Sequence, residues 1–269
     1  MSEVFREALL RDKVAFITGG TRGINLSIAE TFVRHGARVV VVGRDAERAR
    51  EAEATLKAAA QHGGDALGMS CDVRDYGALA RCFAETRARF GLVDIVVNGA
   101  AGNFPAPAAA MSANAFKSVV DIDLLGTFNT CRAAFEHLRT PGASVVSISA
   151  GQASHPAALQ SHVCAAKAGV DMITRTLAIE WGPLGVRVNS IAPGPIEDTE
   201  GMRRLTPTDE MRAKLAAQIP LGRYGTREEI AELALFLCTP AARYITGAVL
   251  VADGGQSLLG FGGLGQLFG

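Results

Sequence analysis

Short runs of β-branched residues alternate along this chain with longer amphipathic stretches. The run at 38–42 carries four consecutive valines, which is typical of a strand buried on both faces of a parallel sheet. The stretch at 46–61 is rich in Ala, Glu and Arg, residues that favour helices. The pattern predicts strands at 14–18, 38–42, 66–71, 94–98, 144–149, 186–191 and 249–252. It predicts helices at 24–35, 46–61, 76–90, 113–138, 162–181 and 228–238.

Strands that alternate with helices of this length form βαβ units, which assemble into a parallel sheet. We therefore predict an α/β fold of the Rossmann type, a doubly wound parallel sheet of about seven strands with helices on both faces. A chain of 269 residues can form one such core, so we assign 1–269 to a single domain. An irregular segment at about 194–220 is long for a loop, and we expect it to be a lid over a substrate.

Composition narrows the possible functions. The 27 basic and 27 acidic residues cancel, so the chain has no overall attraction for nucleic acid or an anionic membrane, and we expect neither as a partner. No apolar run is long enough to span a bilayer. The five cysteines lack CxxC spacing, which argues against a metal site or a disulfide framework and favours a reducing compartment. No signal peptide is evident, and the final residues, 266–269, are not a recognised peroxisomal address, so we expect a cytoplasmic protein.

A glycine-containing turn follows the first predicted strand and opens the first helix. Glycines in this position allow a tight turn and let the backbone approach a pyrophosphate, while the helix directs its N–H groups at the anion. Asn25 stands where a third glycine is expected, which we interpret as a tolerated variation. The predicted cofactor contacts in this turn are Gly19, Thr21, Arg22, Gly23 and Ile24.

The end of the second strand indicates which dinucleotide binds. An acidic residue there would bond the ribose hydroxyls of NADH, whereas this chain has Arg44, suited to the 2′-phosphate of NADPH. Arg22 could form the other side of the phosphate site. We therefore favour NADPH, although Asp45 beside Arg44 and the usual surface placement of arginine count against it.

Further cofactor contacts are predicted after the later strands, because ligands bind at the carboxyl ends of strands in open α/β sheets. Asp72 could accept a hydrogen bond from the adenine amino group and could also cap the next helix, since the two roles do not exclude each other. The full set of these contacts is Asp72, Val73, Asn98, Gly99, Ala100, Pro193, Gly194, Ile196 and Thr199.

Together with Lys167 and Asn189, these motifs resemble the short-chain dehydrogenase/reductase family from about Lys13 to Gly255. That family usually carries out catalysis with an Asn, a Ser and a Tyr-x-x-x-Lys pair. The chain keeps Lys167 but has Val163 in place of the tyrosine. At the serine and asparagine positions it has Ala150 and Asp123, respectively. A conventional alcohol dehydrogenase or 3-oxoacyl reductase is therefore doubtful.

A narrower resemblance accounts for these replacements. The segments 98–104, 121–128, 165–167 and 192–201 are similar to 2,4-dienoyl-CoA reductases, above all to the peroxisomal type, which also lacks that tyrosine and pairs an aspartate with the lysine. The resemblance implies NADPH-dependent reduction of a 2,4-dienoyl-CoA, an acyl-CoA thioester, to a 3-enoyl-CoA in unsaturated fatty-acid β-oxidation. It also implies a homotetramer built through the helices around Phe128 and Ile173.

The same resemblance implies the catalytic roles. Lys167 would bond the nicotinamide ribose and supply positive charge, and Asp123 would hold Lys167 or a water that delivers a proton. The side chains expected on the substrate side are Asn103, Phe104, Ser149, Gln160 and His162. For His162 an ordinary helix-surface position is the competing interpretation.

Two other functions stay open. The chain could be a different acyl-CoA, enoyl or 3-oxoacyl reductase of the same family, including a carbonyl reductase with a relocated acid. It could also be a catalytically silent NADPH-binding protein, because both the serine and the tyrosine are missing.

Overall fold

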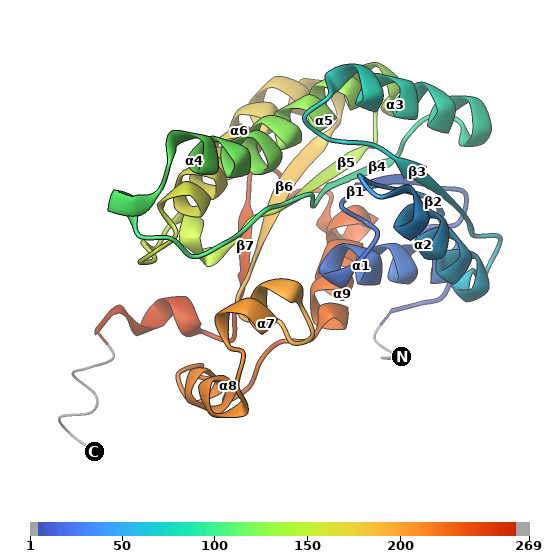
Figure 1. The fold of residues 1–269 in the computed structure, drawn as a ribbon. Helices are drawn as coiled ribbons and strands as arrows, with labels where there is room; N and C mark the ends of the chain where they lie inside the picture. The colour runs from blue at the N-terminus through green and yellow to red at the C-terminus, as the bar shows by residue number, and fades with distance from the viewer. Residues whose placement is uncertain (1–4, 262–269) are drawn as a thin grey trace.

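The computed structural model describes residues 5–261, in which a seven-stranded parallel sheet lies between two layers of helices (Figure 1). The strand order is β3-β2-β1-β4-β5-β6-β7, which is a doubly wound topology and confirms the predicted fold class. The strands are β1 (Val14–Thr18), β2 (Arg38–Gly43), β3 (Asp65–Ser70), β4 (Ile95–Asn98), β5 (Ser144–Ile148), β6 (Arg187–Pro193) and β7 (Val249–Ala252).

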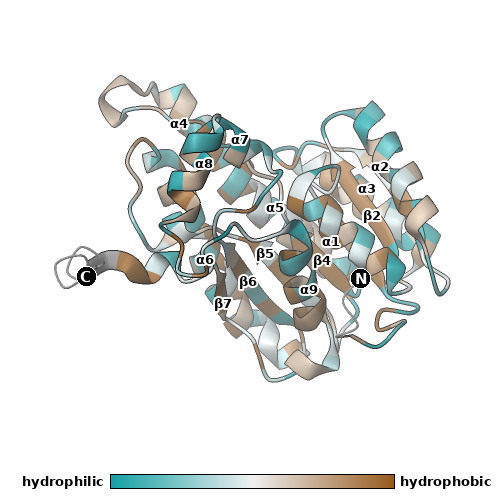
Figure 2. Ribbon diagram, turned by 90° about the horizontal axis from the view of Figure 1, so that it is seen from below, coloured by the Kyte–Doolittle hydropathy of each residue, from teal (hydrophilic) through white to brown (hydrophobic). Residues whose placement is uncertain are grey.

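Successive side chains of each strand point to opposite faces of the sheet, so the core has two halves. In β1, Ala15 and Ile17 face one side, against α1 (Gly23–Arg34), α2 (Ala46–Ala59) and α9 (Arg227–Cys238). Val14 and Phe16 face the other side, against α3 (Tyr76–Phe90), α5 (Gly126–Ala134) and α6 (Ser161–Trp181). Figure 2 shows the hydrophobic strands β2, β4 and β6 enclosed between these helices. Burial on both faces explains why β1 and β2 appear as nearly continuous apolar runs in the sequence.

The predicted helix at 113–138 is divided in the structure. It consists of α4 (Ala113–Val120), a π-helical turn (Asp121–Leu125), α5 and a short 3-10 turn (Phe135–His137). The wider π turn adds a residue to the helical repeat, and such turns are frequent at functional sites. It places the Asp123 side chain in the interior, where 1% of the residue is exposed.

The segment predicted as an irregular lid contains two short helices, α7 (Glu200–Leu205) and α8 (Asp209–Ala216), which lie next to each other (Figure 1). Each begins at a threonine whose hydroxyl accepts a hydrogen bond from the first turn, Thr199 for α7 and Thr208 for α8. The other predicted boundaries agree with the structure to within two residues. In the described part of the chain, no helix has the combined length and apolarity needed to traverse a bilayer.

Candidate active site

A cavity of about 1360 Å³ opens at the carboxyl ends of β1 to β5 and extends beneath α7. Most of the residues predicted from the sequence line it: Gly19, Thr21, Arg22, Gly23, Ile24, Arg44, Asp72, Val73, Gly99, Ala100, Asn103, Asp123, Ser149, Lys167 and Thr199. The predicted residues outside its lining are Asn98, Phe104, Gln160, His162, Pro193, Gly194 and Ile196. The structure thus brings together residues from separate segments at the sheet edge where ligands bind in this architecture.

The glycine turn has the backbone geometry that a pyrophosphate site requires. Gly19 (φ +66°) lies so close to the loop after β4 that a Cβ there would be 2.9 Å from the backbone of Ala100. Gly23 also has a left-handed φ of +59°, a conformation that L side chains rarely adopt. Among the residues that the structure describes, no side chain caps the start of α1, so the N–H groups of its first turn can bind an anion. These residues fit a dinucleotide cofactor.

Asn25 has a structural reason to stand at the third glycine position. Its Nδ2 donates a 2.8 Å hydrogen bond to the carbonyl oxygen of Gly99, which ties α1 to the loop after β4. A Cβ on Gly99 would be 2.1 Å from the Oδ1 of Asn25. At this contact the small residue that allows close approach is therefore Gly99 in the loop after β4, and not a glycine on α1.

The close contact between Asn25 and Gly99 leads to a prediction about stability. We expect Gly99→Ala to lower the free energy of unfolding by about 1–3 kcal/mol, because overpacking displaces the Asn25 amide. Urea denaturation measures the change. The control is Gly151→Ala, where an added Cβ meets nothing within 4 Å. Combining Asn25→Gly with Gly99→Ala should restore most of the loss; equal destabilisation in the single and double variants would contradict this account.

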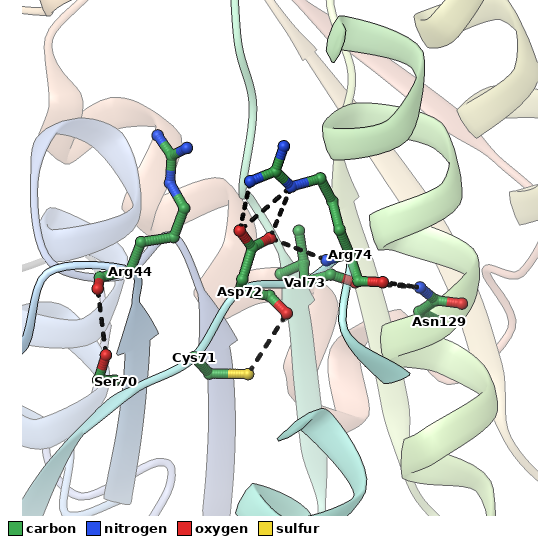
Figure 3. Close-up of polar contacts among 7 residues, drawn as sticks. All are labelled: Arg44, Ser70, Cys71, Asp72, Val73, Arg74 and Asn129. Carbon is green, nitrogen blue, oxygen red and sulfur yellow. Dashed lines mark hydrogen bonds and ion pairs between the residues drawn. The ribbon is translucent and has the colours of Figure 1, made fainter. Parts of the chain in front are cut away.

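The predicted adenine end of the cavity contains a cluster of charged side chains (Figure 3). Asp72 accepts from the Arg74 guanidinium, with Nε 3.0 Å from Oδ1 and Nη2 2.6 Å from Oδ2. The Arg74 hydrogen bond holds the pKa of Asp72 below its usual value despite partial burial, and the charge of Arg44 contributes in the same direction. The prediction that Asp72 also caps the next helix is wrong, because Asp75 caps α3. Arg74 was not predicted as a site residue from the sequence. The one available signal was its position two residues after Asp72.

A buried ion pair forms part of the cavity wall. Lys167 Nζ is 3.3 Å from Asp123 Oδ2 and donates a 2.9 Å hydrogen bond to the Ile148 carbonyl oxygen. Asp123 Oδ1 accepts a 2.7 Å hydrogen bond from the Gly102 backbone N–H. The two residues are 7% and 1% exposed, so water screens this pair little. The arrangement fixes an ammonium group at the cavity wall and gives it a carboxylate partner.

The surroundings of this pair lack a phenol. Val163 and Ala150 line the cavity near Lys167, at the positions where the resemblance expects tyrosine and serine. All three tyrosines of the chain lie in its described part, and none lines the cavity. The described residues of the cavity wall therefore supply no phenolic acid.

The side chains expected on the substrate side fall into two groups. Ser149 Oγ and Asn103 Oδ1 belong to cavity-lining residues and have no hydrogen-bond partner among the described residues. His162 is outside the cavity lining and packs against Phe104, with ring centroids 4.4 Å apart and ring planes tilted by 37°, and it is fully buried. The helix-surface interpretation of His162 is therefore wrong. Gln160 is also buried, and its Oε1 accepts from Gln152 Nε2 at 3.0 Å.

Helix α7 contacts both ends of the cavity. Glu200 forms ion pairs with Arg22 of the glycine turn and with Arg204 one helical turn later. Arg204 Nη1 donates a 3.4 Å hydrogen bond to the Asn103 carbonyl oxygen. The structure thus places Arg22 against α7, whereas Arg44 makes no ion pair in the described residues.

Comparison with known proteins gives matches over nearly the whole chain. Residues 19–257 match the family model described as "Enoyl-(Acyl carrier protein) reductase". A peroxisomal 2,4-dienoyl-CoA reductase of Pongo abelii, described as (3E)-enoyl-CoA-producing, is 49% identical over 257 residues, which are 95% of this chain and 87% of that protein. The Rattus norvegicus protein of the same name is 49% identical over 255 residues, 94% of this chain and 86% of its own length.

A solved structure agrees with these sequence matches. The crystal structure of a short chain dehydrogenase from Bacillus anthracis has a TM-score of 0.80 and 37% identity to this chain, and covers 92% of this chain and 97% of its own. These findings confirm the resemblance indicated by the motifs.

Proposed function

Because the chain belongs to the short-chain dehydrogenase/reductase family, we propose that it catalyses NADPH-dependent reduction of a 2,4-dienoyl-CoA to a (3E)-enoyl-CoA, an auxiliary step of unsaturated fatty-acid β-oxidation. The observation that carries the proposal is the buried Lys167–Asp123 pair in a cavity without a tyrosine. The names of the similar relatives support the same substrate class.

Reduction of a conjugated dienoyl thioester requires different catalytic groups from reduction of a ketone. When bound, the nicotinamide supplies the hydride. The negative charge that develops extends along the conjugated system to the thioester oxygen, where hydrogen-bond donors stabilise it. The proton is then required on carbon, so a phenol directed at a carbonyl oxygen is unnecessary. The cavity lining, which includes Lys167 and Asp123 but no tyrosine, matches these requirements of the reaction.

Lys167 suits the electrostatic part of the reaction. Its ammonium has three N–H donors, of which one binds the Ile148 carbonyl and another faces Asp123, leaving one for the cavity. Asp123 Oδ1 is held by the Gly102 N–H, while Oδ2 faces the ammonium and can accept from a water that carries the proton.

Ser149 and Asn103 are the candidates to donate to the thioester oxygen. Ser149 directly follows Ile148, and Asn103 directly follows Gly102, so each adjoins a backbone group that holds the ion pair. The Ser149 hydroxyl has no partner among the described residues, and a buried hydroxyl without one is costly. A substrate oxygen at this wall would satisfy it.

The direct test follows NADPH oxidation with a 2,4-dienoyl-CoA, a 2-enoyl-CoA and a 3-oxoacyl-CoA in parallel. We expect turnover of the dienoyl substrate alone, with the product double bond at carbon 3 by NMR. Preferred turnover of either other thioester would select another reductase of this family. NADPH binding without any turnover would select a silent nucleotide-binding protein.

The choice of NADPH depends on Arg44, which lies at the end of β2 and lines the cavity. We expect Arg44→Asp to lower the kcat/KM ratio of NADPH over NADH by about 10- to 100-fold, because a charge-assisted contact to the 2′-phosphate becomes a repulsion. Steady-state kinetics with both cofactors measure the ratio. Arg50→Asp, on the exposed side of α2, is the matched control. An unchanged ratio in Arg44→Asp would remove this residue from phosphate recognition.

A homotetrameric, cytoplasmic enzyme completes the proposal. Large apolar side chains remain exposed along α4 to α6, an arrangement typical of subunit contacts. They are Phe116, Leu125, Phe128, Phe135, Met172 and Ile179. The five unpaired thiols suit a reducing compartment, although the similar relatives are named peroxisomal. Sedimentation equilibrium tests the tetramer, and cell fractionation tests the location.

A further inference from the structure

A buried asparagine holds the cavity wall at the predicted adenine end without lining the cavity itself. The loop at 72–75 lies between β3 and α3, and its residues Asp72 and Val73 line the cavity. Asn129, on α5, is 8% exposed and directs its amide at this loop (Figure 3). Its Nδ2 donates a 3.1 Å hydrogen bond to the Val73 carbonyl oxygen and a longer one, of 3.5 Å, to that of Arg74. Asn129 therefore ties the loop to the helix layer.

One face of α5 contacts this part of the chain at three points. Gly126, Asn129 and Arg132 stand three residues apart, so they lie on the same side of the helix. A Cβ on Gly126 would be 2.5 Å from Val73 Cγ2, so helix and loop are in close contact. Arg132 Cζ lies 4.5 Å from the centre of the Tyr76 ring, where α3 begins. This face of α5 thus follows the chain from Val73 to Tyr76.

The position of the loop decides where the Asp72 carboxylate lies. The Arg74 backbone N–H donates a 3.0 Å hydrogen bond to Asp72 Oδ1, and the Arg74 guanidinium binds both carboxylate oxygens. These contacts orient the carboxylate relative to the backbone of Arg74. Because the loop lies outside β3 and α3, neither strand pairing nor helical hydrogen bonds fix that backbone. The Asn129 amide supplies hydrogen bonds that these two elements do not.

We propose that Asn129 is a positioning residue for the dinucleotide, which holds the loop at 72–75 where it contacts adenine. The inference rests on the proposed use of NADPH as cofactor. Asn129 is outside the cavity lining, so it acts through Asp72 and Val73, which form the wall. Loss of its amide should therefore weaken the contacts of the adenine half of the cofactor. NADPH and NADH share this half, so both should lose affinity, in contrast to the effect expected at Arg44.

The experiment compares Asn129→Leu with the parent protein, both at full length. Leucine is similar in size to asparagine but has no N–H, so the Val73 and Arg74 carbonyl groups lose their donor. Fluorescence titration should give a dissociation constant for NADPH raised by ~3- to 10-fold, equivalent to about one lost hydrogen bond. The dissociation constant of 2′,5′-ADP, the adenine half of NADPH, should rise by the same factor when measured by displacement. That of NADH should also rise by this factor, so the preference between the two cofactors should not change.

Two further variants on α5 make the test specific. Thr130→Val is the matched control, because Thr130 is fully buried and donates a 2.7 Å hydrogen bond to the Gly126 carbonyl oxygen within the helix. It loses a buried hydrogen bond but no contact with the loop, so it should bind both NADPH and 2′,5′-ADP as the parent does. Arg132→Gln changes an exposed side chain and removes only the contact with the Tyr76 ring. It should weaken both ligands by about twofold, and it replaces Asn129→Leu in the test if that variant does not fold.

Each other outcome overturns the positioning role. Unchanged affinities in Asn129→Leu would mean that the loop keeps its place without the amide. A loss for NADPH without an equal loss for 2′,5′-ADP, or a loss of the same size in Thr130→Val, would mean that the effect is general to the fold. A parent protein that binds no NADPH would overturn the proposed function itself and this inference with it. The titrations require no dienoyl-CoA turnover, so failure at Asn129 is distinguishable from failure of the proposed reaction.

Discussion

Lys167→Met is expected to lower kcat for a 2,4-dienoyl-CoA by about 10²–10⁴-fold, because the variant loses the fixed ammonium at the cavity wall. The same change leaves the Asp123 carboxylate buried beside a methionine. Removing one partner of a buried ion pair costs about 3–5 kcal/mol, so the variant should also unfold at a lower urea concentration. Single-turnover kinetics at a temperature where circular dichroism shows the variant folded separate the two effects.

The control for Lys167→Met is Lys117→Met on α4. Lys117 pairs with Asp121 four residues later, and 68% of its side chain is exposed, so its removal should change stability by no more than about 1 kcal/mol and leave turnover unaltered. If Lys167→Met kept kcat within about tenfold of the parent protein, the ammonium would have no part in the chemical step.

The fold could be predicted because several strands of the sheet, β1, β2, β4 and β5, are covered on both faces. Strands such as β2 must then be apolar throughout, and that pattern is visible without knowledge of the partners. The short helices of the lid were harder to predict, because half of the residues of α8 are charged and none is buried. Their capping threonines, Thr199 and Thr208, were the available signals.

The π turn at Asp121–Leu125 could not be predicted from local sequence. Its residues suit an α-helix equally well, and the contacts around Asp123 come from distant segments: the Gly102 N–H and the Lys167 ammonium. Local propensity carries no information about such contacts. The position of Asp123 in the site was nevertheless predictable from the resemblance. The order of residues in a family motif stays the same when the local helix geometry changes.

Side-chain direction was the main limit on predicting the site. Asn98 ends β4 as expected, but its Nδ2 donates to Ser147 Oγ at 3.1 Å, within the sheet. His162 begins a long helix, yet packing against Phe104 buries it completely. In both cases the covering residue is distant in the sequence. The sequence can predict which strand ends meet, whereas the face that each side chain joins depends on packing.

Asp123→Asn is expected to lower kcat by about 10²-fold or more while leaving the affinity for NADPH nearly unchanged. The asparagine Oδ1 can still accept the 2.7 Å hydrogen bond from the Gly102 N–H, so the π turn and the loop after β4 should keep their positions. Lys167 loses its counter-ion, and a proton-carrying water loses a charged acceptor. The glycine turn and Arg44 are untouched, so fluorescence titration should give the parent NADPH affinity.

The double variant Lys167→Met/Asp123→Asn distinguishes a catalytic role of this pair from a structural one. With both charges removed, no unpaired charge remains buried, so most of the stability lost in Lys167→Met should return. Turnover should not return, because neither the ammonium nor the carboxylate is present. Asp121→Asn, two residues away in the same π turn, is the matched control and should keep full activity. Recovery of turnover together with stability would mean that the pair serves the fold alone.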